Sequence, residues 1–183
     1  INNMSTNCAV ILAGGQGKRM KSELPKPMFK VLGEPMLEWV IKACKSASLS
    51  DLCIVKGYNA DQIDNYLNGR YPTVLQAERK GTGHAVMQAT DFLESHTDGS
   101  TLVLCADAPF IDEATIQDSL TFHLERNNAV TVITSNVEKP FGYGRIIRST
   151  DGISAIVEEK DASDEQKKIT EINSGAYWFK TDA

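Results

Sequence analysis

A glycine-rich loop followed by an arginine stands directly after a short apolar run near the start of the chain. It reads Leu12-Ala13-Gly14-Gly15-Gln16-Gly17-Lys18-Arg19. Glycines let backbone N–H groups approach phosphate oxygens, and a nearby cation neutralises the phosphate charge. Lys26 stands between two prolines on the same loop and could supply a second positive charge to a polyphosphate. A tight turn without a ligand is the alternative, and Arg19 favours the phosphate loop.

The loop matches neither of two better-known phosphate-binding motifs. A Walker A loop needs Ser or Thr after Gly-Lys, whereas Arg19 follows Gly17-Lys18, and Leu12 occupies the position of its earlier glycine. A dinucleotide fingerprint needs a third glycine where Met20 stands. Both of these nucleotide-binding classes are therefore excluded.

Strand-like and helix-like patterns alternate over the first two thirds of the chain, which is typical of a parallel α/β sheet with right-handed crossovers. Strands are expected at residues 8–12, 52–55, 73–76, 101–105 and 128–134, and helices at residues 36–44, 61–67, 84–93 and 113–124. The last third predicts a more antiparallel region with strands at 145–148, 153–157 and 176–179, a hairpin turn at Asp151-Gly152 and a short helix at 164–168. We therefore predict an α/β, Rossmann-like three-layer fold with a mainly parallel central sheet and a smaller antiparallel region.

Asp107 follows the expected strand 101–105 and so lies at the carboxyl edge of the predicted sheet, where open α/β sheets bind ligands. A helix N-terminal aspartate is the alternative for this residue, but Asp112 is better placed for that role.

Composition narrows the class of protein. The chain has 183 residues, 42% of them hydrophobic, and a net charge of −5 with dispersed basic residues, which exclude a disordered chain and a general nucleic-acid binder. No apolar run approaches the roughly 20 residues that span a bilayer, and the first residues lack a signal-peptide pattern. We expect one cytoplasmic domain over residues 1–183, with all four cysteines as reduced core thiols and no zinc site.

Five segments in a fixed order carry a resemblance to a known family. The pattern L-A-G-G-x-G-x-R-M followed by L-P-K resembles the signature of sugar-1-phosphate nucleotidyltransferases. Residues 74–78, 81–86, 141–146 and 156–162 with 171–175 narrow the resemblance to the uridyltransferase half of the bacterial bifunctional N-acetylglucosamine-1-phosphate uridyltransferases. The resemblance runs from about Cys8 to Phe179 and implies a nucleotide-diphospho-sugar transferase type of fold.

The resemblance implies a reaction. The family makes UDP-N-acetylglucosamine and pyrophosphate from UTP and N-acetylglucosamine 1-phosphate with Mg²⁺. The expected partners are therefore these two substrates, without nucleic acid or membrane, and a homo-oligomer stays open.

The resemblance also assigns roles to particular residues. It implies nucleotide binding by Leu12, Ala13, Gly14, Gly15, Gln76, Gly81 and Thr82, sugar-phosphate binding by Gly144, Glu158 and Asn173, Mg²⁺ ligation by Asp107, and charge stabilisation by Arg19 and Lys26. The side-chain amide of Gln76, together with main-chain groups, suits the alternating acceptors and donor on the uracil edge.

Three departures from the family pattern concern this site. Ala106 replaces a usual glycine before Asp107, and Phe141 and Ser174 stand where threonines are usual. Family members continue beyond the equivalent of Ala183 and carry a second metal-binding Asn or Asp there, so we expect the domain to be incomplete at its C-terminus. A different sugar-1-phosphate nucleotidyltransferase and a non-catalytic binding module are the alternatives.

Overall fold

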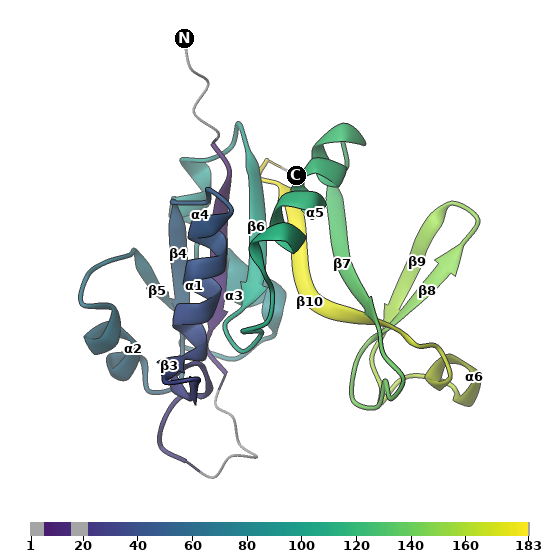
Figure 1. Cartoon of the computed structure of the whole chain (residues 1–183), viewed down its shortest axis with the longest axis horizontal. Helices are drawn as coiled ribbons and strands as arrows, with labels where there is room; N and C mark the ends of the chain where they lie inside the picture. Colours follow the sequence, from purple (N-terminus) through teal and green to yellow (C-terminus); the bar gives the residue numbers. More distant parts are fainter. Residues whose placement is uncertain (1–5, 16–21, 183) are drawn as a thin grey trace. The chain divides into compact units, whose positions relative to one another are not determined.

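The computed structural model describes residues 6–15 and 22–182 (Figure 1). They divide into two compact units. The first contains the described residues up to Thr131 together with those from Trp178 onward, and the second contains Val132–Tyr177. No helix in the described ranges is long and apolar enough to cross a membrane.

A parallel sheet forms the centre of the first unit. Its strands are β1 (Cys8–Ala13), β4 (Leu52–Lys56), β5 (Thr73–Leu75) and β6 (Ser100–Cys105), in the order β5-β4-β1-β6, and β10 (Glu171–Lys180) follows β6. Val10 of β1 aligns with Cys53 of β4 and with Val103 of β6. Because β1 is a continuous apolar run with neighbours on both sides, it occupies the middle of the sheet.

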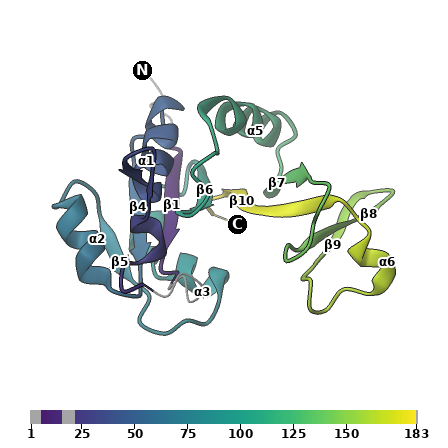
Figure 2. The ribbon, with the colours of Figure 1, turned by 60° about the horizontal axis from the view of Figure 1, so that its bottom comes forward.

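Helices cover both faces of this sheet. Figures 1 and 2 show α1 (Met36–Ser46) and α5 (Glu113–Glu125) on one face and α3 (Thr82–Met87) on the other. The apolar residues of α1 recur every three or four positions and are buried: Met36, Leu37, Val40, Ile41 and Cys44. A further helix, α2 (Ala60–Leu67), links β4 to β5. The predicted three-layer α/β arrangement with a mainly parallel sheet is confirmed.

The prediction of one helix over 84–93 is wrong. Two helices, α3 and α4 (Thr90–Glu94), replace it and meet at Gln88-Ala89. The backbone N–H of Ala89 bonds to the carbonyl three residues back, and the Thr90 hydroxyl donates to the carbonyl of Met87 at 2.6 Å. Side-chain bonding of this kind competes with the regular helical ladder, so the helix stops and restarts.

The sequence analysis missed three short elements before α1. The 3₁₀ helix η2 (Lys26–Met28) follows Pro25, and its Pro27 is buried. The strands β2 (Lys30–Val31) and β3 (Glu34–Pro35) form a small antiparallel hairpin. These elements contain too few residues to show a period, so no pattern could predict them.

The second unit is antiparallel, as predicted. Strands β8 (Arg145–Ser149) and β9 (Gly152–Val157) pair antiparallel, and β8 also pairs antiparallel with β10. Gly152, at the predicted hairpin turn, has a φ of +125°, which favours glycine. The helix α6 (Asp164–Lys167) begins with a capping box at Ser163. Strands β7 (Val130–Asn136) and β10 each contain residues of both units, and β10 is longer than the predicted 176–179.

Candidate active site

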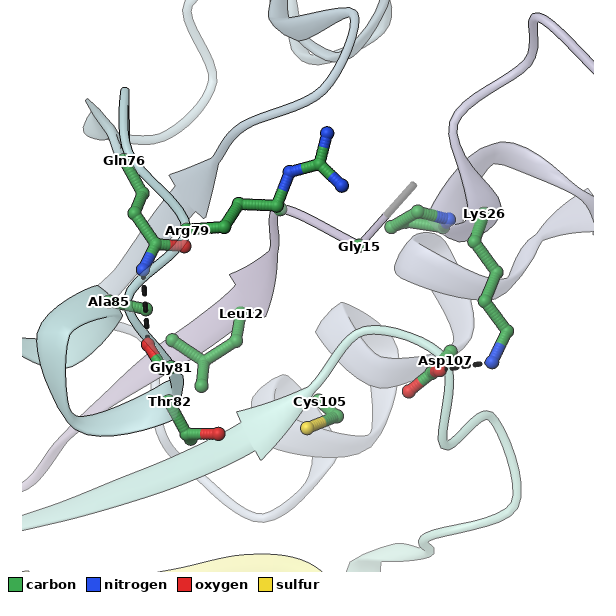
Figure 3. Close-up of a pocket in the computed structure, with 12 residues that line it drawn as sticks. Leu12, Gly15, Lys26, Gln76, Arg79, Gly81, Thr82, Ala85, Cys105 and Asp107 are labelled. Carbon is green, nitrogen blue, oxygen red and sulfur yellow. Dashed lines mark hydrogen bonds and ion pairs between the residues drawn. The ribbon is translucent and has the colours of Figure 1, made fainter. Parts of the chain in front are cut away.

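A cavity of about 270 Å³ lies at the carboxyl edge of the parallel sheet in the first unit (Figure 3). Eight of the residues that were predicted to bind the nucleotide, to stabilise phosphate charge or to ligate the metal line this cavity: Leu12, Gly14, Gly15, Lys26, Gln76, Gly81, Thr82 and Asp107. Four further lining residues were not predicted: Pro27, Arg79, Ala85 and Cys105. Because the parallel strands end at this edge, segments that are far apart in sequence meet here.

The glycine loop is held against the end of the neighbouring strand β4. A Cβ atom added to Gly57 would lie 2.8 Å from Cα and 3.0 Å from the carbonyl oxygen of Gly14, which is too close for a side chain. Gly15 is exposed and lines the cavity, and a Cβ added to it would meet no atom of the described residues within 4 Å. Ala13 is fully buried and does not line the cavity, so only its backbone could take part in binding.

Gln76 is a nearly buried amide with fixed partners, only 7% exposed. Its Nε2 donates to the carbonyl oxygen of Gly81 at 3.0 Å and lies 3.1 Å from Nδ1 of His84. Its Oε1 lies 3.4 Å from the position that a Cβ of Gly14 would occupy. The amide is therefore fixed between the start of α3 and the glycine loop, on the cavity wall.

Lys26 and Asp107 form an ion pair at the other end of the cavity, although 81 residues separate them in sequence. Their side chains are 34% and 35% exposed. An ion pair this accessible to water contributes little to stability. Both side chains can therefore leave the pair and bind a ligand at a small cost in folding free energy. Asp112 accepts a hydrogen bond from the backbone of Thr115 at the start of α5, so capping is the role of Asp112 and not of Asp107.

The prediction that all four cysteines are core thiols is wrong for Cys105. Cys8, Cys44 and Cys53 are buried, whereas Cys105 is half-buried and lines the cavity. Burial, helped by the negative charge of Asp107, raises the pKa of Cys105 to about 11, so the group is a neutral thiol at neutral pH. Ala106 is fully buried and is not among the lining residues, because consecutive residues at a strand end point to opposite faces. Its methyl group therefore does not crowd the cavity.

Arg79 is the charged lining residue that the sequence analysis missed. It follows Gln76 by three residues and is exposed. Its guanidinium lies 5.8 Å from the ring centroid of Tyr58. The available signal was a basic residue between two segments that were already assigned to nucleotide binding.

The three residues predicted to bind sugar phosphate gather in the second unit. The backbone N–H of Asn173 donates to the carbonyl oxygen of Gly144 at 2.8 Å. A Cβ on Gly144 would lie 3.0 Å from Oε1 of Glu158, a tight contact that the Glu158 side chain would have to relieve by moving. The side-chain amide of Asn173 donates to the Tyr177 hydroxyl at 2.6 Å. A buried backbone position, a carboxylate and an amide thus lie together, and such groups suit the hydroxyls and acetamido group of an amino sugar.

Two sequence predictions are left without a structural test. Arg19 lies outside the described residues. Within those residues no group of three or more His, Cys, Asp or Glu side chains could hold a metal ion, and Asp107 is the carboxylate that lines the cavity.

Comparison with known proteins gives one family match and several relatives. Residues 8–183 match the family model described as nucleotidyl transferase. Bifunctional protein GlmU of Acetivibrio thermocellus is 44% identical over 172 residues, and that of Alkaliphilus metalliredigens is 46% identical over 172 residues. Each alignment covers 93% of this chain and 37% of the relative, so the chain spans well under half the length of these relatives.

Two solved structures share the fold at low sequence identity. A putative glucose-1-phosphate thymidylyltransferase from Bacillus anthracis in complex with a sucrose gives a TM-score of 0.79 at 19% identity, covering 96% of this chain and 72% of that one. UDP-glucose pyrophosphorylase complexed with UDP-glucose gives 0.77 at 18% identity, covering 98% and 77%.

Proposed function

The chain belongs to the nucleotidyl transferase family, and from this premise we propose that it transfers UMP from UTP to N-acetylglucosamine 1-phosphate. The products are UDP-N-acetylglucosamine and pyrophosphate. The observation that carries the proposal is the meeting of Gln76, the Gly14-Gly15 loop, Lys26 and Asp107 around one cavity. The identity of 44% to 46% with proteins named GlmU supports this substrate pair over other sugar phosphates. We also propose that the two compact units act as one nucleotidyltransferase domain, since the family model spans both.

Gln76, with Gly81 and Thr82, is proposed to hold the uracil. Its Nε2 donates a hydrogen bond to the Gly81 carbonyl, and this bond fixes the orientation of the amide on the cavity wall. Uracil presents an N–H donor between two carbonyl acceptors, which a fixed amide oxygen and main-chain N–H groups can match. Purines carry a different pattern on a larger ring system, so they fit this arrangement less well.

The phosphates are proposed to lie along the glycine loop toward Lys26. Glycine backbone without Cβ atoms allows close approach of phosphate oxygens, and the Lys26 ammonium can neutralise charge on the leaving pyrophosphate. On the ground of the family resemblance, Arg19 is also proposed to neutralise charge on the phosphates. Removing one such stabilising group costs on the order of a hundredfold in rate.

Asp107 fits a magnesium ion that is shared with the substrate. Mg²⁺ is bound in many phosphate-transfer sites by one or two carboxylates plus phosphate oxygens and water, and Asp107 is a partly exposed carboxylate on the cavity wall. Lys26 would have to exchange this carboxylate for phosphate oxygens when the ion binds. The ion, when bound, supplies further positive charge to the phosphates.

The acceptor is proposed to bind through Gly144, Glu158 and Asn173. A phosphate oxygen of the sugar phosphate attacks the α-phosphorus of UTP, and the bond from that phosphorus to the bridging oxygen of pyrophosphate breaks. No covalent protein intermediate is needed, so the protein acts by positioning and charge stabilisation.

The test is a pyrophosphate-release assay with UTP, CTP, ATP and GTP, each combined with N-acetylglucosamine 1-phosphate or glucose 1-phosphate. We expect release with UTP and N-acetylglucosamine 1-phosphate to exceed every other pair. The variant Gln76→Glu should lower the preference for UTP, while Gln117→Glu, on the exposed face of α5, should leave it unchanged. A preference for another pair would assign a different sugar-1-phosphate nucleotidyltransferase, and UTP binding without release would assign a binding module.

A further inference from the structure

Arg79 extends over the cavity from the loop that follows β5. In Figure 3 its side chain runs from the Gln76 side of the cavity toward Gly15, so the guanidinium lies away from the Gln76 amide. The ring of Tyr58, 5.8 Å from the guanidinium carbon, supports it. Tyr58 directly follows Gly57, the residue that packs against Gly14. The same strand end therefore fixes both the glycine loop and the arginine beside it.

In Figure 3 the labelled polar residues of the cavity lie in two groups, one on either side of this guanidinium. Gln76, Gly81 and Thr82 provide amide and backbone groups on one side, and Lys26 with Asp107 provides charges on the other. A guanidinium presents five N–H donors in a planar fork that matches two phosphate oxygens at once, and it keeps its charge at every accessible pH. A ring behind the guanidinium restricts its motion, so less entropy is lost when it binds a ligand.

We infer that Arg79 is a specificity-determining residue that binds the phosphate chain of the nucleotide and favours the triphosphate over shorter forms. This inference rests on the proposed function. Stacking on an aromatic ring is not by itself the reason, because Arg126 stacks on Phe122 at 4.6 Å at the end of α5 and does not line this cavity. Among the residues that the structure describes, Arg79 is the one that combines such support with a place in the lining of this cavity.

The experiment measures dissociation constants by calorimetry for uridine, UMP, UDP and UTP. The parent protein is compared with Arg79→Gln, which removes the charge, Arg79→Lys, which keeps it without the fork, and Arg126→Gln, the matched control. Arg79→Gln should weaken UTP binding about ten- to a hundredfold, the usual effect of losing a hydrogen bond to a charged group, and leave uridine binding unchanged. Arg79→Lys should lose less, and Arg126→Gln should match the parent for every ligand.

A fourth variant tests the role of the ring. Tyr58→Leu leaves the Arg79 charge in place but removes its support, so UTP binding should weaken by a smaller factor than in Arg79→Gln. In the parent, UTP affinity should fall as salt is added, and Arg79→Gln should reduce this dependence because one charge contact is lost.

Three outcomes would overturn the inference. If Arg79→Gln loses uridine and UTP affinity equally, Arg79 contacts the nucleoside. If it loses affinity for neither ligand, Arg79 contacts no part of the nucleotide. If the parent binds UTP no better than uridine, the cavity has no phosphate subsite. Failure of the proposed function gives a different result. If the parent prefers another nucleoside triphosphate over UTP, the uridine assignment is wrong, and the Arg79 comparison is read on the preferred triphosphate and its nucleoside.

Discussion

Arg145 is 1% exposed and donates from Nη2 to Oε2 of Glu159 at 2.7 Å within the second unit. The pair fixes the backbone that leads to Gly144. The same Glu159 oxygen accepts the backbone N–H of Gly142 at 3.1 Å, and Nη1 of Arg145 donates to the carbonyl oxygen of Tyr143. Two consecutive residues before the proposed sugar-phosphate site are thus held by one ion pair.

The Arg145–Glu159 pair predicts a specific dependence of stability on pH. Hydrogen bonds from Arg145 and from the Gly142 backbone lower the pKa of Glu159 below its ordinary value of 4.5. Stabilisation from a carboxylate of lowered pKa is fully present above that ordinary value and is lost as pH falls through the lowered one. Thermal unfolding of Glu159→Gln should therefore show a reduced Tm at neutral pH, with a gap from the parent that closes in acid.

The control for this measurement is Glu165→Gln, which removes an exposed carboxylate paired with Lys168. Its Tm should stay close to that of the parent at every pH, since exposed pairs contribute little. A Glu159→Gln gap that did not change with pH would mean that the ion pair is not the cause.

Two glycines of the nucleotide cavity should respond differently to the same substitution. Gly57→Ala places a methyl group against the Gly14 backbone, and strain of this kind costs about 1–3 kcal/mol of unfolding free energy. A methyl group at Gly15 meets no atom of residues 6–15 and 22–182 within 4 Å, so Gly15→Ala should stay within about 0.5 kcal/mol of the parent in stability while UTP affinity falls because the methyl enters the cavity. Urea unfolding and UTP titration of both variants check this. Equal stability of the two variants would contradict the packing of Gly57 on Gly14.

The burial of His123 predicts that the protein loses stability in mild acid. It is 1% exposed, its Nδ1 lies 2.9 Å from the Thr131 hydroxyl, and its Nε2 has no hydrogen-bond partner in the described part of the chain. Burial and the charge of Lys180 lower its pKa below the ordinary 6.5, so the unfolded chain takes up a proton before the folded one. The free energy of unfolding should therefore decrease from about pH 7.5 to about pH 5.5.

Urea unfolding of His123→Leu at the two pH values measures this contribution. The decrease should be smaller in the variant than in the parent, because no buried imidazole is left to protonate. His96→Gln, which removes a histidine beside Asp51, should retain the decrease attributed to His123. An unchanged decrease in His123→Leu would assign it to other groups.

Lys26→Ala should separate activity from stability. The lysine is 34% exposed and paired with an equally exposed Asp107, so its loss should cost less than about 1 kcal/mol of unfolding free energy. The rate of pyrophosphate release should fall on the order of a hundredfold, because the ammonium no longer stabilises the phosphates. Lys42→Ala, which removes an exposed lysine of α1 that is paired with Glu34 of β3, is the matched control and should keep the parent rate. Loss of stability in step with activity would make Lys26 a structural residue.

The sequence alone determined much of this protein because the signals involved are local. Buried strands such as Cys8–Ala13 and the amphipathic helix that begins at Met36 follow from the spacing of apolar residues within a few positions. Gln76 and Gly81 are five residues apart, so two neighbouring motifs contain the partners of a hydrogen bond that the structure shows. At Thr90, where a side chain interrupts the backbone hydrogen bonds, the periodicity of the segment correctly predicted helical structure but missed the break into two helices.

The tertiary structure decided which distant residues meet and which way their side chains point. Lys26 and Asp107 are joined across 81 residues only because β1 and β6 are adjacent parallel strands that end at the same edge. Gly57 must be glycine because its Cα lies against Gly14, a contact that depends on the pairing of β4 with β1. The direction of Cys105 and Ala106 depends on the side of the strand that faces the cavity. Strand order and side-chain direction depend on packing contacts between residues that are distant in sequence. A short window of sequence therefore cannot predict them.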